Sequence, residues 1–387
     1  MARESDDFER EVLDVYGEAA RRDLDLCCPA DYDPKLLAAI PAEVLARDYG
    51  CGDPTRHVRE GETVLDLGSG SGKSAFMVSQ VVGPKGRVIG VDMNDEMLAL
   101  ARRSAPEFVR NVGWDNVSFG KGRIQDLLLD LERVDRELAA RPVRSAAELA
   151  RLEARVAELR VEAPLVADES VDVVISDCVL NLVRPEDKQR LFAEIHRVLK
   201  RGGRAIISDI VSDEDVPLHL RRNPELWTGC ISGAMREDRF LAAFEEAGLY
   251  GMTVVERKEK PWRVVQGVEL RSVTVIAYKG KEGACWDHRQ AVVYRGPFKE
   301  VTDDDGHVLR RGVRVAVCEK TFEIYSKAPY REHLDLVEPR VPVEPLEARP
   351  FPCGVGMLVR DPKETKGEGF VETTEARPVC TPGSGCC

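Results

Sequence analysis

Three cysteines, Cys51, Cys178 and Cys230, stand in three separate loops of the chain. None belongs to a CxxC pair, so the spacing does not support a structural zinc knuckle. If the loops converge, three thiolates without a histidine ligand would suit a soft, thiophilic ion. Spacing alone fits better with the simpler alternative, in which the three are independent buried thiols.

The chain has 11 cysteines in all, and two pairs of them are adjacent in sequence. The pairs are Cys27–Cys28 near one end and Cys386–Cys387 at the other. Neighbouring side chains rarely share one core pocket, so the pairs indicate thiol chemistry. No role is assigned to four further cysteines: Cys285, Cys318, Cys353 and Cys380.

The stretch from Thr63 to Asp92 has the pattern of a ligand-binding unit. It reads as an apolar run, a glycine-rich turn, a helical segment and a second apolar run that stops at an acid. This is the pattern of a βαβ unit that holds a nucleoside, with Asp92 placed to accept both ribose hydroxyls. A P-loop would need glycine at position 67, which is leucine. The glycines follow GxGxG rather than the dinucleotide GxGxxG, which favours S-adenosylmethionine over NAD.

The remaining elements extend this unit into a doubly wound sheet, the layout of class I methyltransferases. A helix is predicted over 94–104, with Asn94 as its N-cap. A further helix is predicted from Pro185 to the glycines at 202 and 203. Strands are predicted at 63–67, 87–92, 117–119, 171–178, 204–211, 251–258 and 272–280.

An insertion and a tail interrupt the regular pattern. Residues 128–163 predict a helical hairpin, and solvated packing is favoured over a coiled coil because too few heptads are present. From about residue 283 proline and glycine become frequent and short strands are expected, including one at 314–325. We expect an N-terminal segment (1–60), a methyltransferase domain (61–282) and a small β-rich or irregular C-terminal domain (283–387).

Composition limits the partners and the compartment. The 387 residues carry a formal charge of -12, which disfavours a nucleic-acid substrate because phosphate backbones are repelled. The charged N-terminus lacks the apolar region of a secretory signal, and no apolar run is long enough to span a bilayer. We expect a cytoplasmic monomer.

Taken together, the cysteine-bearing and glycine-bearing segments resemble the arsenite S-adenosylmethionine methyltransferases. The resemblance covers most of the chain and continues into CWDHRQAVVYRG and PYREHLDLVEP of the tail. The segments that carry it are LDLCCP, YGCGDP, VLDLGSGSG, GVDM, GRIQDL, SDCVLNLV, FAEIHRVLKRGGR and LWTGCISGA.

This resemblance implies roles for particular residues. Cys51, Cys178 and Cys230 would bind As(III), and Cys27 or Cys28 would supply a further thiol that enters a disulfide during turnover. The cofactor would be held by Tyr49, Asp66, Gly68, Gly70, Gly72, Asp92, Met93, Ile124, Gln125 and Asp177. The family usually has asparagine where Asp177 stands, and its insertion is shorter.

The implied reaction is methylation of thiolate-bound arsenic, with thioredoxin or glutathione as the reductant. Cys386 and Cys387 would either capture or shuttle arsenic, resolve a disulfide, or be passive thiols. Two other classes of protein stay open from the residues alone. One is a methyltransferase for another small molecule, with merely buried cysteines. The other is a metalloid-binding protein without activity, against which the glycine turn and Asp92 argue.

Overall fold

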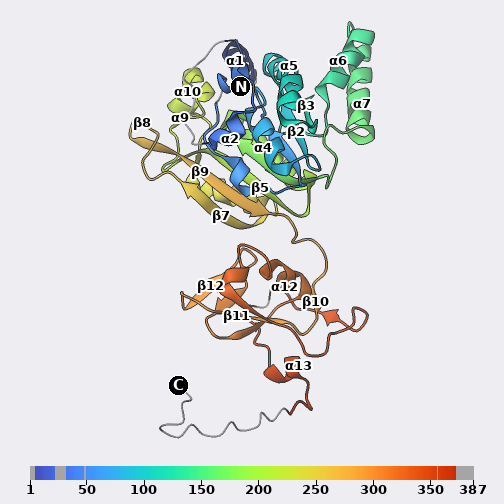
Figure 1. The fold of residues 1–387 in the computed structure, drawn as a ribbon, viewed down its shortest axis with the longest axis vertical. Coiled ribbons are helices and arrows are strands. Elements are labelled where there is room, and N and C mark those ends of the chain that lie inside the picture. The colour runs from blue at the N-terminus through green and yellow to red at the C-terminus, as the bar shows by residue number, and fades with distance from the viewer. Residues whose placement is uncertain (1–4, 22–31, 48, 355, 372–387) are drawn as a thin grey trace. The chain divides into compact units, whose positions relative to one another are not determined.

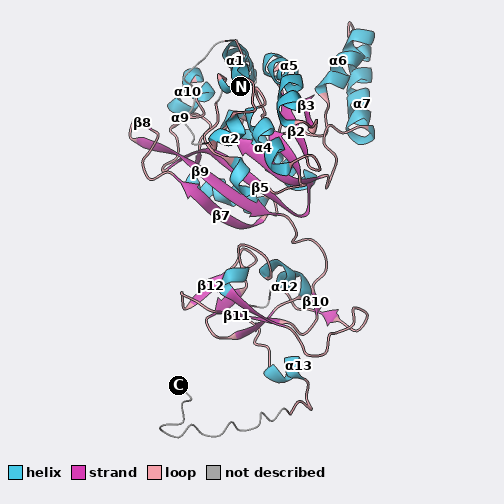
Figure 2. Ribbon diagram, in the orientation of Figure 1, coloured by secondary structure: helices cyan, strands magenta, loops and turns pink. Residues whose placement is uncertain are grey.

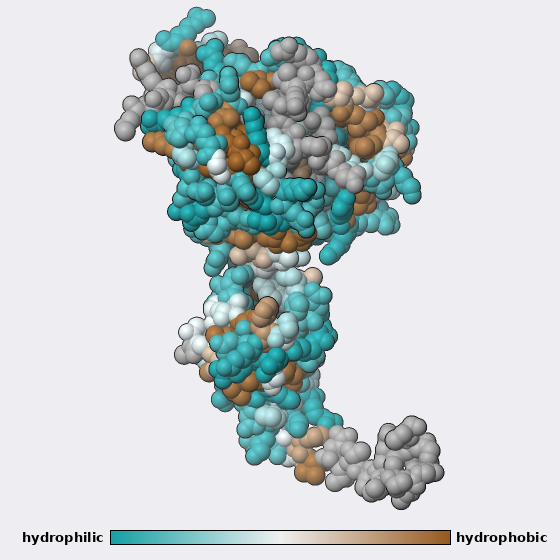
Figure 3. Space-filling model, turned by 90° about the vertical axis from the view of Figure 1, so that its left-hand side faces the viewer, coloured by the Kyte–Doolittle hydropathy of each residue, from teal (hydrophilic) through white to brown (hydrophobic). Residues whose placement is uncertain are grey.

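The computed structural model describes residues 5–21, 32–47, 49–354 and 356–371. The chain forms two compact units, Met1–Gly280 and Lys281–Cys387 (Figure 1). In the part of the chain that the structure describes, no helix has both the length and the apolar character needed to cross a membrane. On the face drawn in Figure 3, hydrophilic residues predominate and hydrophobic residues lie in separate patches.

A mostly parallel sheet forms the centre of the first unit. Its order is β3-β2-β1-β4-β5-β9-β7, and β6 and β8 pair with β5 and β9. The strands from β3 to β5 run parallel, while β9 runs antiparallel to both β5 and β7. The bounds are β1 Thr63–Leu67, β2 Arg87–Asp92, β3 Val117–Lys121, β4 Val171–Asp177, β5 Leu199–Ser212, β6 Met235–Arg236, β7 Tyr250–Arg257, β8 Arg263–Val265 and β9 Val268–Tyr278.

Helices cover both faces of this sheet (Figure 2). Alternate residues of β4 face opposite sides: Val173 and Ile175 pack with α4, whereas Val174 packs with α8 and α11. The doubly wound sheet expected from the sequence is therefore confirmed. The helices are α1 Ser5–Ala19, α2 Pro34–Leu37, α3 Ala42–Leu45, α4 Lys73–Val82, α5 Asp95–Val112, α8 Lys188–Val198, α9 Leu218–Arg221, α10 Pro224–Thr228 and α11 Glu237–Glu246, with short 3-10 turns η1 Pro54–His57, η2 Leu180–Leu182 and η3 Pro185–Asp187.

Two helix ends differ from the prediction. Helix α5 begins after its Asn94 cap but continues past residue 104, through Pro106, to Val112. Proline removes one backbone hydrogen bond, but the buried Phe108 ring packs on Phe76 with centroids 4.5 Å apart, which holds the later turns. Helix α8 ends earlier than predicted, at Val198, because β5 begins at Leu199, which pairs with Val171.

The insertion contains two helices, α6 Leu131–Ala140 and α7 Ala146–Glu162. They lie beside α5 and the β3 edge of the sheet (Figure 1). Side chains cap both helices: Asp130 accepts from the backbone at Glu132 and Arg133, and Ser145 accepts from Glu148. Leu159 of α7 is buried, whereas Leu149 is 47% exposed, so only part of the apolar stripe packs.

The second unit is built from short strands around its own apolar core. A three-stranded sheet, β14-β11-β15, packs against α12. One prediction is wrong here, because residues 319–325 form a helix rather than a strand. The buried Phe322 and Tyr325 are three residues apart, which puts both on one helical face. The bounds are β10 Trp286–Asp287, β11 Ala291–Tyr294, β12 Glu300–Thr302, β13 Val308–Arg310, β14 Arg314–Ala316, α12 Glu319–Tyr325, η4 Arg331–His333, β15 Leu334–Val337, β16 Arg349–Pro350 and α13 Pro362–Lys366.

Candidate active site

The glycine turn joins β1 to α4 at the carboxyl edge of the parallel sheet. Gly68 has a φ of 69°, and a Cβ atom there would collide with the side chain of Val179, the residue after Cys178. Glycine therefore allows the turn to approach the loop that carries one of the thiols. The turn is joined to β2 by a hydrogen bond of 2.8 Å from the Gly70 N–H to Asp92 Oδ2.

Asp92 ends β2 and faces this turn. Its Oδ1 accepts a hydrogen bond of 2.8 Å from the Asn94 N–H, and the Met93 N–H provides a further backbone hydrogen bond. A carboxylate has about four lone-pair sites, so a ribose hydroxyl could still donate to it. Burial raises the pKa of Asp92, and the backbone hydrogen bonds oppose that rise.

Asp66 lies on the adjacent strand β1 and is 2% exposed. Burial, together with the charges of Asp177 and Asp92, raises the pKa of Asp66 to about 8. Asp66 is therefore mostly protonated at neutral pH.

A cleft of about 1150 Å³, including its open mouth, lies at this edge of the sheet. Its size and mixed lining are typical of a site for a ligand as large as a nucleoside derivative. Helix α1 contributes Val12, Leu13 and Tyr16 to its wall. Ten of the residues predicted to bind the cofactor or the substrate line it: Tyr49, Asp66, Gly68, Gly70, Asp92, Met93, Ile124, Gln125, Asp177 and Cys178.

The other predicted residues lie elsewhere. Gly72 is the N-cap of α4, where a Cβ would crowd the Phe119 ring, and it is not among the lining residues. Cys51 and Cys230 are not among the lining residues and lie in the apolar cluster described next. Cys27 and Cys28 lie outside the described residues.

The three separated cysteines do converge. Cys51, Cys178 and Cys230 share one apolar cluster with residues that include Ile210 and Ile231. All three are 2% exposed or less, and all are thiols rather than disulfides. The Cys230 thiol donates to the Cys178 carbonyl at 3.1 Å. Cys178 also lines the cleft, so this one residue connects the thiol cluster to the nucleoside side of the site.

The backbone at two of these thiols has an unusual conformation. Cys178 has a φ of 60° and Cys230 a φ of 59°, in the left-handed region that residues with a side chain rarely adopt. Such conformations persist only where surrounding contacts hold them, and they concentrate at functional sites. At Cys178 the holding contact includes a hydrogen bond of 2.8 Å from its N–H to the Ser208 carbonyl.

Asp177 fastens the Cys51 loop to the end of β4. Its Oδ1 accepts the N–H groups of Cys51 at 2.7 Å and of Gly52 at 2.9 Å. A Cβ at Gly50 would collide with the Asp177 carboxylate, so glycine lets the loop come this close. On the other side, the Ser272 hydroxyl donates to the Cys51 carbonyl at 3.0 Å. Asp177 thus holds the backbone of Cys51 in place and also lines the cleft. An asparagine at this position has the same shape and could accept the same hydrogen bonds.

Sequence reasoning missed a buried polar chain beside Cys230. Lys188 of α8 donates to the Gly233 carbonyl at 2.6 Å and to Asn181 Oδ1 at 3.2 Å. Asn181 Nδ2 in turn donates to Asp209 Oδ1 at 2.8 Å. Burial lowers the pKa of Lys188 to about 8, opposed by the charges of Asp209 and Cys230, and burial raises the pKa of Asp209. The signal was present, because Lys188 precedes the buried Leu191, Phe192 and Ile195 at helical spacing.

Replacing Lys188 with methionine is expected to lower the free energy of unfolding by about 3–5 kcal/mol, because Asn181 Oδ1 and the Gly233 carbonyl would lose their donor and the buried Asp209 would lose its neighbouring positive charge. Urea denaturation measures the loss. Lys200→Met is the matched control, since its surface ion pair with Asp172 should contribute less than about 1 kcal/mol. Equal losses in the two variants would contradict a structural role for the buried chain.

A parallel sheet with a glycine turn, an acid at the end of the second strand and a cleft between them defines a class I methyltransferase. A family model described as a methyltransferase domain matches residues 59–137 and 137–248. A second model, a domain of unknown function (DUF8838), matches residues 281–370. The arsenite methyltransferase of Aquipseudomonas alcaligenes is 31% identical over 348 residues, with 84% of this chain and 90% of that protein covered. The chain belongs to the arsenite methyltransferase family.

Other relatives agree with this assignment. The arsenite methyltransferase of Mus musculus is 28% identical, with 100% of this chain and 98% of that protein covered. Among solved structures, an arsenic(III) S-adenosylmethionine methyltransferase from Chlamydomonas reinhardtii matches with a TM-score of 0.54 at 27% identity. That match covers 81% of this chain and 99% of the other.

Proposed function

We propose that the chain transfers a methyl group from S-adenosylmethionine to trivalent arsenic held by the thiolates of Cys51, Cys178 and Cys230. The observation that carries the proposal is the position of Cys178, which belongs to the thiol cluster and also lines the cleft. A methyl acceptor bound at the thiols would therefore face a methyl donor bound in the cleft. The family's named activity supports the same substrate.

Arsenite enters the thiol cluster by exchange of its oxygen ligands. As(OH)3 and three thiols give a trithiolate and three water molecules. Thiolates are the binding form, so capture depends on pH. The apolar residues around the cluster exclude water from the arsenic–sulfur bonds. The three sulfurs are not among the described donor groups that lie within 4.8 Å of one another, so we propose that arsenite draws them together as it binds.

The cofactor would be held by the glycine turn, by Asp92 at the ribose and by the other lining residues named above. When bound, it supplies a methyl group made electrophilic by the sulfonium. The lone pair of arsenic held by Cys51, Cys178 and Cys230 would accept this methyl group, and S-adenosylhomocysteine would be the other product. No general base is required, because no proton is removed from the acceptor. The protein contributes position and the exclusion of water.

Methyl transfer formally oxidises arsenic to the pentavalent state, so two electrons must return. Two thiols can supply them by forming one disulfide. We propose that Cys27 or Cys28 provides one of these thiols and that thioredoxin or glutathione then reduces the disulfide. We also propose that the enzyme acts as a monomer in the cytoplasm.

Incubation with arsenite, S-adenosylmethionine and a thiol, followed by identification of arsenic species by chromatography and mass spectrometry, tests this function. Methylated arsenicals are expected, and alkylation of the thiols should remove them. Arsenic binding without any methylated product would instead identify a metalloid-binding protein. Methylation of another small molecule that survives thiol alkylation would identify a different methyltransferase.

The ionisation of Asp66 gives a prediction for cofactor binding. As pH rises through about 8, Asp66 gains a negative charge, which should favour the cationic S-adenosylmethionine over S-adenosylhomocysteine. The preference is expected to rise about threefold to tenfold between pH 6.5 and 9.5, because one negative charge is added to the wall of the cleft that would hold the cationic cofactor. Calorimetric Kd values for both ligands at each pH measure it.

Asp66→Asn provides the control, since its ratio should not change with pH. The raised pKa of Asp66 also affects the stability of the fold. A carboxyl whose pKa is higher in the folded than in the unfolded protein stabilises the fold fully only below its unfolded pKa. That contribution is lost as pH rises from about 4 through about 8. A ratio that changes equally in both proteins would show that another group is responsible.

A further inference from the structure

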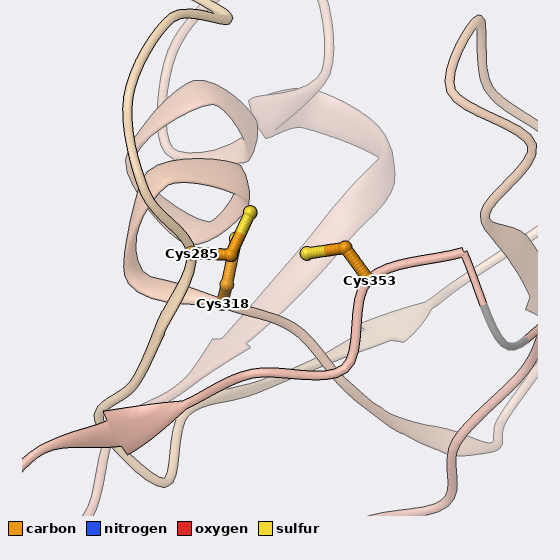
Figure 4. A group of neighbouring side chains, drawn as sticks. All are labelled: Cys285, Cys318 and Cys353. Carbon is orange, nitrogen blue, oxygen red and sulfur yellow. The ribbon is translucent and has the colours of Figure 1, made fainter.

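Three cysteines outside the proposed catalytic site meet in the C-terminal unit. Cys285 lies in the loop before β10, Cys318 caps α12, and Cys353 follows β16. Figure 4 shows the Cys285 and Cys318 side chains close together, with the Cys353 sulfur pointing toward them from a separate segment. Sixty-eight residues of sequence separate the first from the last, so the fold alone brings them together.

The three sulfurs form a compact set of donors. All lie within 4.8 Å of one another, and all three are free thiols. Among the described residues, this set includes no fourth Cys, His, Asp or Glu atom. Burial grades across the set, from the buried Cys318 through Cys285 to the exposed Cys353. An ion could therefore enter from the Cys353 side and reach two sheltered sulfurs.

The surroundings favour a thiolate at this place. Burial opposes ionisation of Cys285, but hydrogen bonds with Cys353 and Cys318 and the charge of Lys320 lower the pKa of Cys285 below its ordinary value. Lys320 is held nearby by a hydrogen bond of 3.0 Å to the Gly283 carbonyl. Cys318 is fixed by the Thr321 N–H, which donates to its sulfur at 3.4 Å. Burial and the neighbouring thiols raise the pKa of Cys353.

We propose that Cys285, Cys318 and Cys353 form a second ion-binding site, which holds a soft, thiophilic ion as a trithiolate. Two ions share this chemistry, arsenite and Zn²⁺. Three donors match trivalent arsenic, which forms three bonds and keeps a lone pair, whereas zinc in structural sites takes four protein ligands. Arsenite is therefore the occupant that the site favours. Binding converts As(OH)3 and three thiols into the trithiolate and three water molecules, with no change in oxidation state.

This site goes beyond the proposed methyl transfer and does not depend on it, because none of its residues lines the cleft or joins the catalytic thiols. The test uses the full chain with the other eight cysteines replaced by serine, so that only the three remain. The replaced residues are Cys27, Cys28, Cys51, Cys178, Cys230, Cys380, Cys386 and Cys387. The reduced protein is incubated with arsenite and desalted, and its arsenic and zinc are measured by mass spectrometry.

The expected result is about one arsenic per chain with three sulfur neighbours by X-ray absorption, and near-complete loss on adding Cys353→Ser. Cys353 is the variant of choice because it is exposed and should not disturb the core. Equal arsenic with and without Cys353 would overturn the proposal. One zinc per chain that arsenite does not displace would overturn arsenite as the occupant while keeping the trithiolate site.

A second comparison covers the case in which eight substitutions prevent folding. The unaltered chain and its single Cys353→Ser variant should differ by about one bound arsenic, with the same methylation rate. Identical arsenic content in these two proteins would count against the site. The binding difference can be measured whether or not methylation occurs, so failure of the proposed function would be recognised separately.

Discussion

Arsenite methylation is expected to fall by about 1000-fold or more when Cys178 is replaced by serine, because a hydroxyl is a poor ligand for a soft ion. Among the cysteines that the structure describes, Cys178 alone both joins the cluster and lines the cleft. The rate of formation of methylated arsenicals at saturating S-adenosylmethionine measures the loss. Affinity for S-adenosylmethionine should change by less than about threefold, since serine preserves the shape of the wall.

Cys353→Ser is the matched control for this change, being the same substitution at a thiol outside the cleft. It should retain full methylation activity. Substantial activity in the Cys178 variant would rule out the trithiolate model, whereas equal losses in both variants would indicate a general effect of removing thiols.

Replacing Asp177 with alanine is expected to lower kcat/KM for arsenite by about 100-fold, because two hydrogen bonds to the Cys51 loop are lost. The buried N–H groups of Cys51 and Gly52 would then have to move to find other acceptors, and the Cys51 thiol would move with them. Asp177→Asn should stay within about tenfold of the unaltered chain, because an amide oxygen accepts the same two bonds.

Binding measurements separate this positioning role from cofactor contact. Arsenite binding to the alanine variant should weaken while S-adenosylmethionine affinity is largely retained. If affinity for S-adenosylmethionine falls equally in the alanine and asparagine variants, Asp177 acts chiefly through the cofactor. Its hydrogen bonds to the Cys51 loop would then not explain the loss of activity.

Local patterns in the sequence predicted the strand, glycine turn and acid that line the cleft. The glycine turn and Asp92 lie within one βαβ unit, whose geometry is set by neighbouring residues, and the structure has them as one cleft wall. The ends of helices and strands were less predictable where packing between distant segments determines them. The turns of α5 after Pro106 depend on contact between Phe108 and Phe76, and the helix at 319–325 depends on the small core of its own unit.

Convergence of distant residues could not be derived from spacing. Cys51, Cys178 and Cys230 could have been three unrelated thiols, and only resemblance to a family connected them before the structure did. Helical spacing placed Lys188 beside a buried face, but its connection to Asp209 through Asn181 joins residues from separate segments and could not be read from spacing. Cys285, Cys318 and Cys353 likewise have no shared motif, and they are neighbours only because three separate loops meet.

The left-handed backbone at Cys178 and Cys230 implies a trade-off between thermal stability and activity. Each conformation costs an ordinary residue about 1–2 kcal/mol, a cost that glycine avoids. A selection for heat resistance alone should therefore enrich glycine at these two positions and produce tougher but inactive proteins. Cys178 and Cys230 are two of the five described residues other than glycine with a positive φ, and the proposed arsenic binding by their thiols means that relieving this backbone cost would remove activity.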